Sequence, residues 1–244
     1  MLTSPVIKIG SSPDTWSDSY RPLPTINPEG RDSALFTIQQ TGSPCGFSLE
    51  PLASRHIEQA VCVHLLAFPG FFLSFLGPRF LREFYASFLA DPVGIGFVAL
   101  SSSGDVIGAV LGPLNPQGYF GRLLRRRWWA FCLASIGAVG RHPACLKRLL
   151  RAVFYRGEVP SGPVRALLSS ISVSPSAQGH GVGKALIHRW VEETRQRGAN
   201  GCYLTTDAEG NDDINAFYQR IGWRLESAYM TPEDRQMNRY VFDW

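Results

Sequence analysis

The chain has 244 residues, of which 45% are hydrophobic and 18% charged. This composition excludes a wholly disordered, collagen-like or coiled-coil protein, and the length suits one large or two small domains. The five cysteines are scattered without a C-x-x-C pair, which argues against a disulfide framework and a structural zinc site. We therefore expect reduced thiols and a cytoplasmic protein.

The basic residues are concentrated in one part of the chain. Of the 24 Lys and Arg residues, nine lie within 119–156, where no Asp or Glu occurs, and the rest of the chain carries 15 basic and 20 acidic residues. The nine are Arg122, Arg125, Arg126, Arg127, Arg141, Lys147, Arg148, Arg151 and Arg156. The positive net charge of +4 thus comes from the segment 119–156. The longest apolar stretch, 128–139, is shorter than the about 20 residues that span a bilayer, and we expect no signal peptide.

The first part of the chain predicts a leader followed by mixed elements. Residues 1–41 are rich in Ser, Pro, Asp and Gly and are interpreted as a flexible leader, with one domain over 42–244. Apolar spacing and turn residues predict, in order, a strand near 47–52, a helix after Ser54 that ends at Pro69-Gly70, a second helix over 73–89, and a hairpin of 95–100 with 106–111.

The second part of the chain begins with the basic segment, interpreted as a helical insertion over 119–160 in two pieces. After it the pattern predicts a buried strand over 166–173, a helix over 182–197, a strand over 202–206, a helix over 211–220, and an antiparallel pair of 223–230 with 238–244. This order indicates an α/β fold, neither a strict βαβ repeat nor an all-β sandwich.

A glycine-rich turn between a predicted strand and helix carries the clearest chemical signal. It reads Gln178-Gly179-His180-Gly181-Val182-Gly183-Lys184. Three glycines at a helix N-terminus leave backbone N–H groups exposed, and the helix dipole adds positive potential, so the turn suits a pyrophosphate. The spacing fits neither a Walker P-loop, which would need Gly at Gln178 and Ser or Thr at Ala185, nor the G-x-G-x-x-G dinucleotide pattern.

Two motifs resemble those of the GCN5-related N-acetyltransferase (GNAT) superfamily. The run Val173-x-Pro175-x-x-Gln178-Gly179-x-Gly181-Val182-Gly183-x-Ala185-Leu186 resembles its acetyl-coenzyme A (acetyl-CoA) motif. Downstream, Asn211, Phe217-Tyr218 and Gly222-Trp223 resemble its second motif, with Ile214 where a small residue is usual. The resemblance implies a mixed, mostly antiparallel central sheet flanked by helices, here with the helical basic insertion.

The resemblance also implies direct transfer of an acetyl group from acetyl-CoA to an amine, without a metal. Its counterparts for cofactor binding are the backbone of Ile171, Ser172 and Val173 for the pantetheine arm, the turn Gln178, Gly179, His180, Gly181, Val182, Gly183 and Lys184 for the pyrophosphate, and Asn211 with Tyr218. Tyr218 corresponds to the general acid that protonates the leaving thiolate, and a phenol of pKa about 10 stays protonated at neutral pH.

The general base is not assigned by sequence. Many family members use a Glu on the strand before the turn, but 166–173 contains no Asp, Glu or His. His64, Glu83 and Asp207 are candidates by placement, each with a structural role as the alternative. A water relay, or an acceptor amine that is already neutral, would remove the need for a base.

The acceptor is expected to be a small molecule with a primary amine, with an amino sugar or nucleotide sugar as the favoured class. By the resemblance, His64, Phe68, Phe71 and Phe72 would shape its pocket, and core packing is their alternative. For the basic segment 119–156 three interpretations stay open: peripheral contact with an anionic membrane, capture of a phosphate-bearing acceptor, and a solvated cationic face. No nucleic-acid recognition motif is present.

Two other functions remain compatible with the sequence. One is a non-catalytic acetyl-CoA-binding or membrane-associated scaffold, which the missing acid on the strand favours. The other is acetylation of a protein N-terminus or lysine, which would need a groove for an extended peptide. The sequence does not determine the oligomeric state.

Overall fold

The computed structural model describes residues 46–69, 72–123, 125–126, 129–131, 165–231 and 234–244. The expected leader therefore lies outside the described residues, as does most of the basic insertion. The described residues of that insertion between 119 and 131 are helical.

Four strands form a first, antiparallel sheet in the order β1-β2-β3-β5. These strands are β1 (Phe47–Pro51), β2 (Gly94–Ser101), β3 (Val106–Pro113) and β5 (Ser170–Val173). The expected hairpin is confirmed as β2 and β3, and Gly104 in the connecting turn has a φ of 86°. The strand β5 lies at one edge of this sheet.

A second sheet has the order β4-β6-β8-β7. It consists of β4 (Ala166–Leu167), β6 (Gly201–Asp207), β7 (Arg224–Met230) and β8 (Gln236–Asp243). Of the strand pairs that the structure describes, only the short pair β4 and β6 is parallel. The expected antiparallel pair near the end of the chain is confirmed as β7 and β8.

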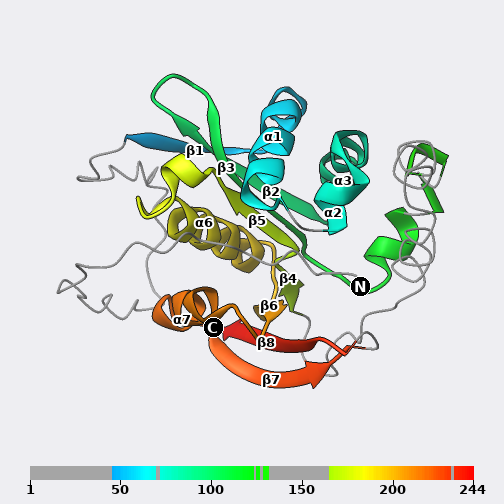
Figure 1. Ribbon diagram of the computed structural model, residues 1–244. Coiled ribbons are helices and arrows are strands. Elements are labelled where there is room, and N and C mark those ends of the chain that lie inside the picture. Colours follow the sequence, from blue (N-terminus) through cyan, green and yellow to red (C-terminus); the bar gives the residue numbers. More distant parts are fainter. Residues whose placement is uncertain (1–45, 70–71, 124, 127–128, 132–164, 232–233) are drawn as a thin grey trace, which may run out of the picture.

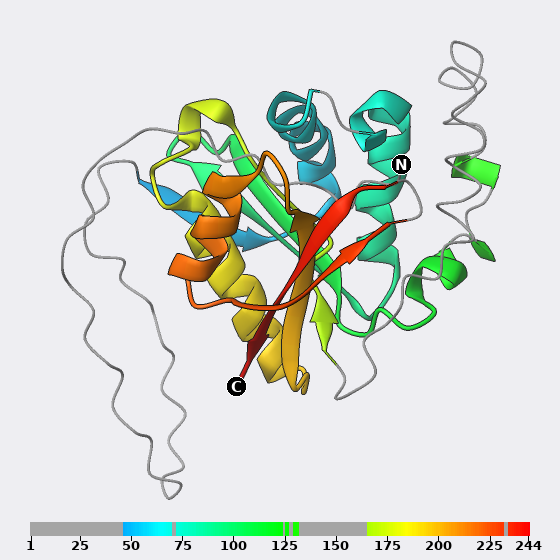
Figure 2. The same ribbon diagram turned by 60° about the horizontal axis from the view of Figure 1, so that its bottom comes forward.

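Helices cover both faces of the first sheet (Figure 1). A 3-10 turn η1 (Ser54–His56) leads into α1 (Ile57–Ala67), which packs with α2 (Phe72–Leu76) and α3 (Pro78–Ala90) on one face. On the other face α6 (Val182–Gln196) contacts strands of both sheets, and α7 (Asp212–Arg220) packs on the second sheet. Figure 2 shows β7 and β8 as a curved pair beside these two helices.

The prediction of one helix over 73–89 is wrong, because the chain breaks at Gly77. This glycine has a φ of 92°, and Pro78 opens α3. A proline is well tolerated in the first turn of a helix but cannot continue a helix that arrives from its N-terminal side. The apolar stripe spans the break, so periodicity alone joined α2 to α3.

The prediction of one strand over 166–173 is also wrong, because β4 and β5 belong to different sheets. The Leu168 N–H donates to the Tyr203 carbonyl of the second sheet (2.9 Å), and the next N–H, of Ser169, donates to the Leu111 carbonyl of the first sheet (3.0 Å). Gly112 lies so close to this junction that a Cβ would collide with the Leu167 carbonyl. The two sheets therefore part at Leu168 and Ser169.

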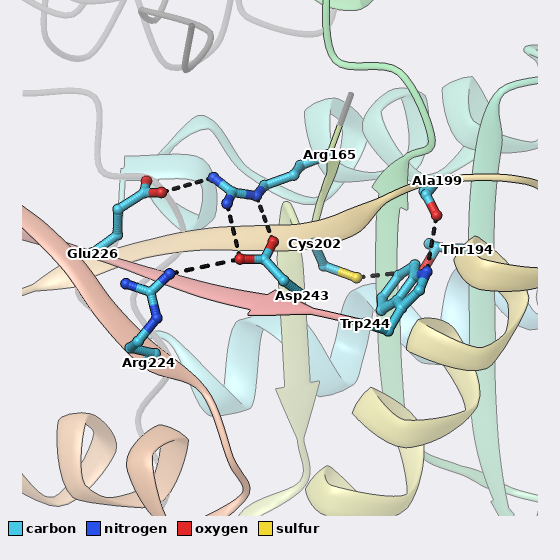
Figure 3. Close-up of polar contacts among 8 residues, drawn as sticks. All are labelled: Arg165, Thr194, Ala199, Cys202, Arg224, Glu226, Asp243 and Trp244. Atoms are coloured by element: carbon cyan, nitrogen blue, oxygen red, sulfur yellow. Dashed lines mark hydrogen bonds and ion pairs between the residues drawn. The ribbon is translucent and has the colours of Figure 1, made fainter. Parts of the chain in front are cut away.

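A polar cluster ties the strands of the second sheet together at the start of β4 (Figure 3). Arg165 donates to both carboxylate oxygens of Asp243 (2.7 and 2.9 Å) and to Glu226 (2.7 Å), which ties the start of β4 to β7 and β8. The indole N–H of Trp244 donates to the Ala199 carbonyl (3.0 Å) before β6. These contacts hold β4 and β6 in place, and so help to fix where the sheets separate.

Candidate functional site

The separation of the sheets leaves the outer edge of β5 without a neighbouring strand among the residues that the structure describes. The Ser174 N–H donates inward to the Ile107 carbonyl of β3 (2.8 Å). Because backbone groups alternate in direction along a strand, the N–H groups of Ile171 and Val173 point to the outer edge, whereas that of Ser172 points toward β3. The edge of β5 can thus pair with an extended ligand through Ile171 and Val173.

The glycine-rich turn joins this edge to the N-terminus of α6. Gly179 and Gly181 have φ angles of 79° and 80°, and Gly181 is the helix N-cap, which offers no side chain to the first helical N–H groups. The buried side chain of Val182 anchors the turn in the core, whereas His180 and Lys184 are exposed. The turn therefore presents backbone donors and positive helix potential at its open side.

Gln178 has a role that the motif did not reveal. Its amide nitrogen donates to the Val173 carbonyl at 3.1 Å, so the side chain closes the turn back onto the end of β5. This contact helps to fix the position of the strand edge relative to the helix N-terminus. Gln178 therefore has a structural role in the site.

Tyr218 lies on α7 with no exposed surface, and its ring is near those of Trp223 (5.9 Å between centroids) and Tyr240 (5.7 Å). Its hydroxyl has no hydrogen-bond partner within the described part of the chain. Burial raises the pKa of Tyr218 well above its ordinary value, so the hydroxyl stays protonated. A buried donor without a partner is costly, and a bound ligand would supply one.

Asn211 precedes α7 and is buried. Its amide nitrogen donates to Thr206 Oγ1 (2.7 Å) and to the Asp207 carbonyl (3.3 Å) at the end of β6. These bonds hold the start of α7 against β6, which places Tyr218, two helical turns on, in the core between the helices and the sheets.

The face of β6 opposite α6 carries charged and aromatic groups. Cys202 points toward α6, with its sulfur 3.4 Å from Thr194 Oγ1, so Tyr203 and Asp207 lie on the other face. There Asp207 pairs with Arg235, and the Arg239 guanidinium lies 5.9 Å from the Tyr203 ring centroid. Burial raises the pKa of Asp207 and the contact with Arg235 opposes that effect. Asp207, one of the candidate bases, is thus already held in an ion pair with Arg235.

The residues expected to shape the acceptor pocket are only partly described. His64 and Phe68 are both buried and pack ring to ring, 4.9 Å between centroids. Phe71 lies outside the described residues, and of Phe72 only the backbone, at the start of α2, is described. Glu83, the third candidate base, lies partly buried on α3. The structure therefore places His64 and Phe68 in the core, and their contact with an acceptor stays a prediction.

One residue beside β5 could not be recognised from the sequence as part of the site. Tyr85 belongs to the apolar stripe of α3, yet its hydroxyl lies 3.3 Å from His64 Nδ1 and 3.5 Å from Ser172 Oγ. Burial lowers the pKa of His64 to about 4 and raises that of Tyr85 to about 12. Both groups are therefore uncharged at neutral pH.

The geometry fits acetyl-CoA on observations independent of any motif. Three features of the described residues meet the needs of an extended arm, a diphosphate and a leaving thiolate: a strand edge without a neighbour, a glycine-capped helix N-terminus and a buried hydroxyl without a partner. Among the described residues no group of three or more His, Cys, Asp or Glu side chains could hold a metal ion. No helix in the described ranges is long and apolar enough to cross a membrane.

Comparisons with known proteins agree with this geometry. The family model described as "Acetyltransferase (GNAT) family" matches residues 66–223. A protein assigned to the GNAT family from Desulfovibrio desulfuricans is similar in structure, with a TM-score of 0.54 and 13% identity over 81% of this chain and 99% of that one. Arabidopsis thaliana NAA60 in complex with acetyl-CoA has a TM-score of 0.51 and 15% identity over 81% and 98%. Both likenesses show the fold. No curated protein sequence matches the chain.

Proposed function

Because the matched segment takes up more than half of its length, the chain belongs to the acetyltransferase (GNAT) family, and on this premise we propose that it acetylates the primary amine of a small molecule. Membership makes the protein an acyltransferase that uses acetyl-CoA as its co-substrate. The small-molecule class, with amino sugars and nucleotide sugars as the favoured acceptors, is the proposed part.

The observation that supports acetyl transfer by this chain is the outer edge of β5, which has no neighbouring strand among the described residues. The N–H groups of Ile171 and Val173 on that edge are suited to hold the pantetheine arm, and a thioester carbonyl bonded there would be polarised toward attack. The N–H groups that follow Gly181 would hold the diphosphate. The reacting carbon is then held at the point where the two sheets separate.

Tyr218 is proposed as the general acid. The amine nitrogen forms a bond to the carbonyl carbon, the carbon–sulfur bond breaks, and the thiolate takes the Tyr218 proton. The proton lost by the amine passes to water and restores the phenol. The hydroxyl is buried and protonated and has no partner in the part of the chain that the structure describes, which supports this role.

A panel of amines tests the acceptor class. We expect thiol release from acetyl-CoA with 2-amino-2-deoxy sugars or their nucleotide derivatives, and at least about tenfold lower kcat/KM with peptides that offer a free N-terminus or a lysine. Higher kcat/KM for the peptides would contradict the small-molecule class. Binding of CoA in calorimetry without turnover of any amine would favour the scaffold.

The basic segment supports a further proposal, a peripheral contact with anionic lipid. Arg125, Arg126 and Trp129 are exposed, Trp129 to 56%, and arginine with tryptophan suits a lipid interface. We expect the protein to sediment with phosphatidylserine vesicles and an Arg125→Ala/Arg126→Ala variant to sediment severalfold less. A variant in which the exposed residues Arg195 and Arg220 are both replaced by alanine serves as the control. If all three proteins stay in the supernatant, the segment is a solvated cationic face.

A further inference from the structure

Among the described residues, the side chains on β5 and at the position just before it form an uncharged lining. Ser169, Ser170 and Ser172 are buried there, and the hydroxyls of Ser169 and Ser170 have no hydrogen-bond partner among the described residues. Such hydroxyls can accept a hydrogen bond from an amine N–H. They can neither balance the charge of an ammonium ion nor keep its proton.

The groups behind this lining are neutral as well. Ser172 Oγ lies 3.5 Å from the Tyr85 hydroxyl, which lies 3.3 Å from His64 Nδ1, and all three residues are buried. The other imidazole nitrogen of His64 has no partner in the described part of the chain. With the pKa of His64 near 4 and that of Tyr85 near 12, this line of contacts carries no charge between those pH values.

The charged groups on the surrounding elements have little electrostatic effect on Ser172, Tyr85 and His64. β3 and β5 carry no titratable side chain. On the same face as the serines, α1 carries Glu58 and Cys62, and α3 carries Arg79, Arg82 and Glu83. On the opposite face, α6 carries Lys184, His188, Arg189, Glu192, Glu193 and Arg195, of which Arg189 pairs with Glu193, and the neighbouring β6 carries Cys202, Tyr203 and Asp207. Glu58 pairs with Arg82 at 2.5 Å and Asp207 pairs with Arg235. Burial alone accounts for the lowered pKa of His64, which is the pattern expected when no charge lies close to it.

An ammonium ion that enters such a lining loses its hydration and gains no counter-charge, which disfavours the charged form. We propose that this uncharged lining restricts the enzyme to the neutral form of its acceptor and so selects weakly basic primary amines, of the α-amino and amino-sugar kind, over lysine side chains and polyamines. This inference rests on the proposed function and narrows its substrate class. In ordinary water an α-amino group has a pKa of about 7.7–8.0 and a lysine amine about 10.4, so near neutral pH their neutral fractions differ by about 300-fold.

The pH dependence of kcat/KM for different amines tests the proposal. The probes are ethylamine, 2-fluoroethylamine and 2,2-difluoroethylamine, whose basicity falls with each fluorine while their size changes little, together with every panel amine that turns over. We expect kcat/KM to rise about tenfold per pH unit and to level off at the pKa of each amine itself. A break at one common pH for all amines would reveal an ionising enzyme base and overturn the proposal. Glu83→Gln or Asp207→Asn would then show whether either is that base, by removing the break.

The Tyr85 hydroxyl lies 3.5 Å from Ser172 Oγ, so we infer that Tyr85 positions the Ser172 hydroxyl, and this role has a separate readout. Tyr85→Phe should lower kcat/KM about tenfold without moving the pH at which the profile levels off, and without changing the Kd for CoA. Tyr119→Phe, at a second fully buried tyrosine that packs against Phe88 instead, should leave kcat/KM unchanged. Equal losses in both variants, or weaker CoA binding in Tyr85→Phe alone, would assign Tyr85 a merely structural role. Failure to acetylate any amine would instead contradict the proposed function.

Discussion

Replacing Tyr218 with phenylalanine is expected to lower kcat about 100-fold or more while the protein becomes no less stable. The activity falls because a positioned general acid contributes about 10²–10⁴-fold to rate. The stability is kept or rises by up to ~1 kcal/mol because the hydroxyl is buried without a hydrogen-bond partner in the described structure, and its removal relieves an unmet desolvation cost. Steady-state kinetics and urea unfolding of the same preparation measure both.

Tyr240 provides a matched control for this variant. Its ring lies 5.7 Å from that of Tyr218, but its hydroxyl donates to Asn215 Oδ1 at 3.0 Å. Tyr240→Phe should therefore cost about 1 kcal/mol of stability and leave kcat within about twofold. A full kcat in Tyr218→Phe would remove Tyr218 from the chemistry, and a large loss of stability there would mean that the hydroxyl is bonded in solution.

Replacing Gly181 with aspartate is expected to weaken CoA binding by at least about 30-fold, or ~2 kcal/mol. No atom lies within 4 Å of a Cβ at this position, so the carboxylate would project into open space at the N-terminus of α6, where the diphosphate is expected. Gly181→Asn adds a similar volume without the charge, and asparagine tolerates the left-handed backbone, so we expect it to weaken binding by less than about tenfold. Isothermal titration calorimetry gives both values.

The opposite end of the same helix supplies the control for backbone strain. Gly198 follows α6 and has a φ of 86°, and a Cβ at this position would also have no atom within 4 Å. Gly198→Asp should reduce stability by about 1–2 kcal/mol, since a left-handed backbone and a helix C-terminus both disfavour aspartate, and should leave the Kd for CoA unchanged. Equal Kd values for Gly181→Asp and Gly181→Asn would show that no anion lies at the turn.

The sequence by itself determined the parts of this protein that depend on local chemistry. Glycines at 179 and 181 adopt positive φ angles at a helix N-terminus, as the turn pattern predicts, because few other residues do so at low cost. The hairpin of β2 and β3 follows from two strand-like runs around a short glycine-containing turn, and the final antiparallel pair is also found where the sequence predicts it. The family follows from two motifs, each contained in a short segment, and the family model confirms it.

The tertiary structure alone decided how the site is assembled. Residues 166–173 are apolar enough for one buried strand, and only their neighbours, Tyr203 on one sheet and Leu111 on the other, divide them at Leu168 and Ser169. The contacts of Tyr85 with His64 and Ser172 join positions 21 and 87 residues apart. The local conformational preference of a segment limits the backbone conformations that it can adopt. Which hydroxyl is left without a partner, and which strand edge without a neighbour, depends on distant segments that meet only in the folded chain.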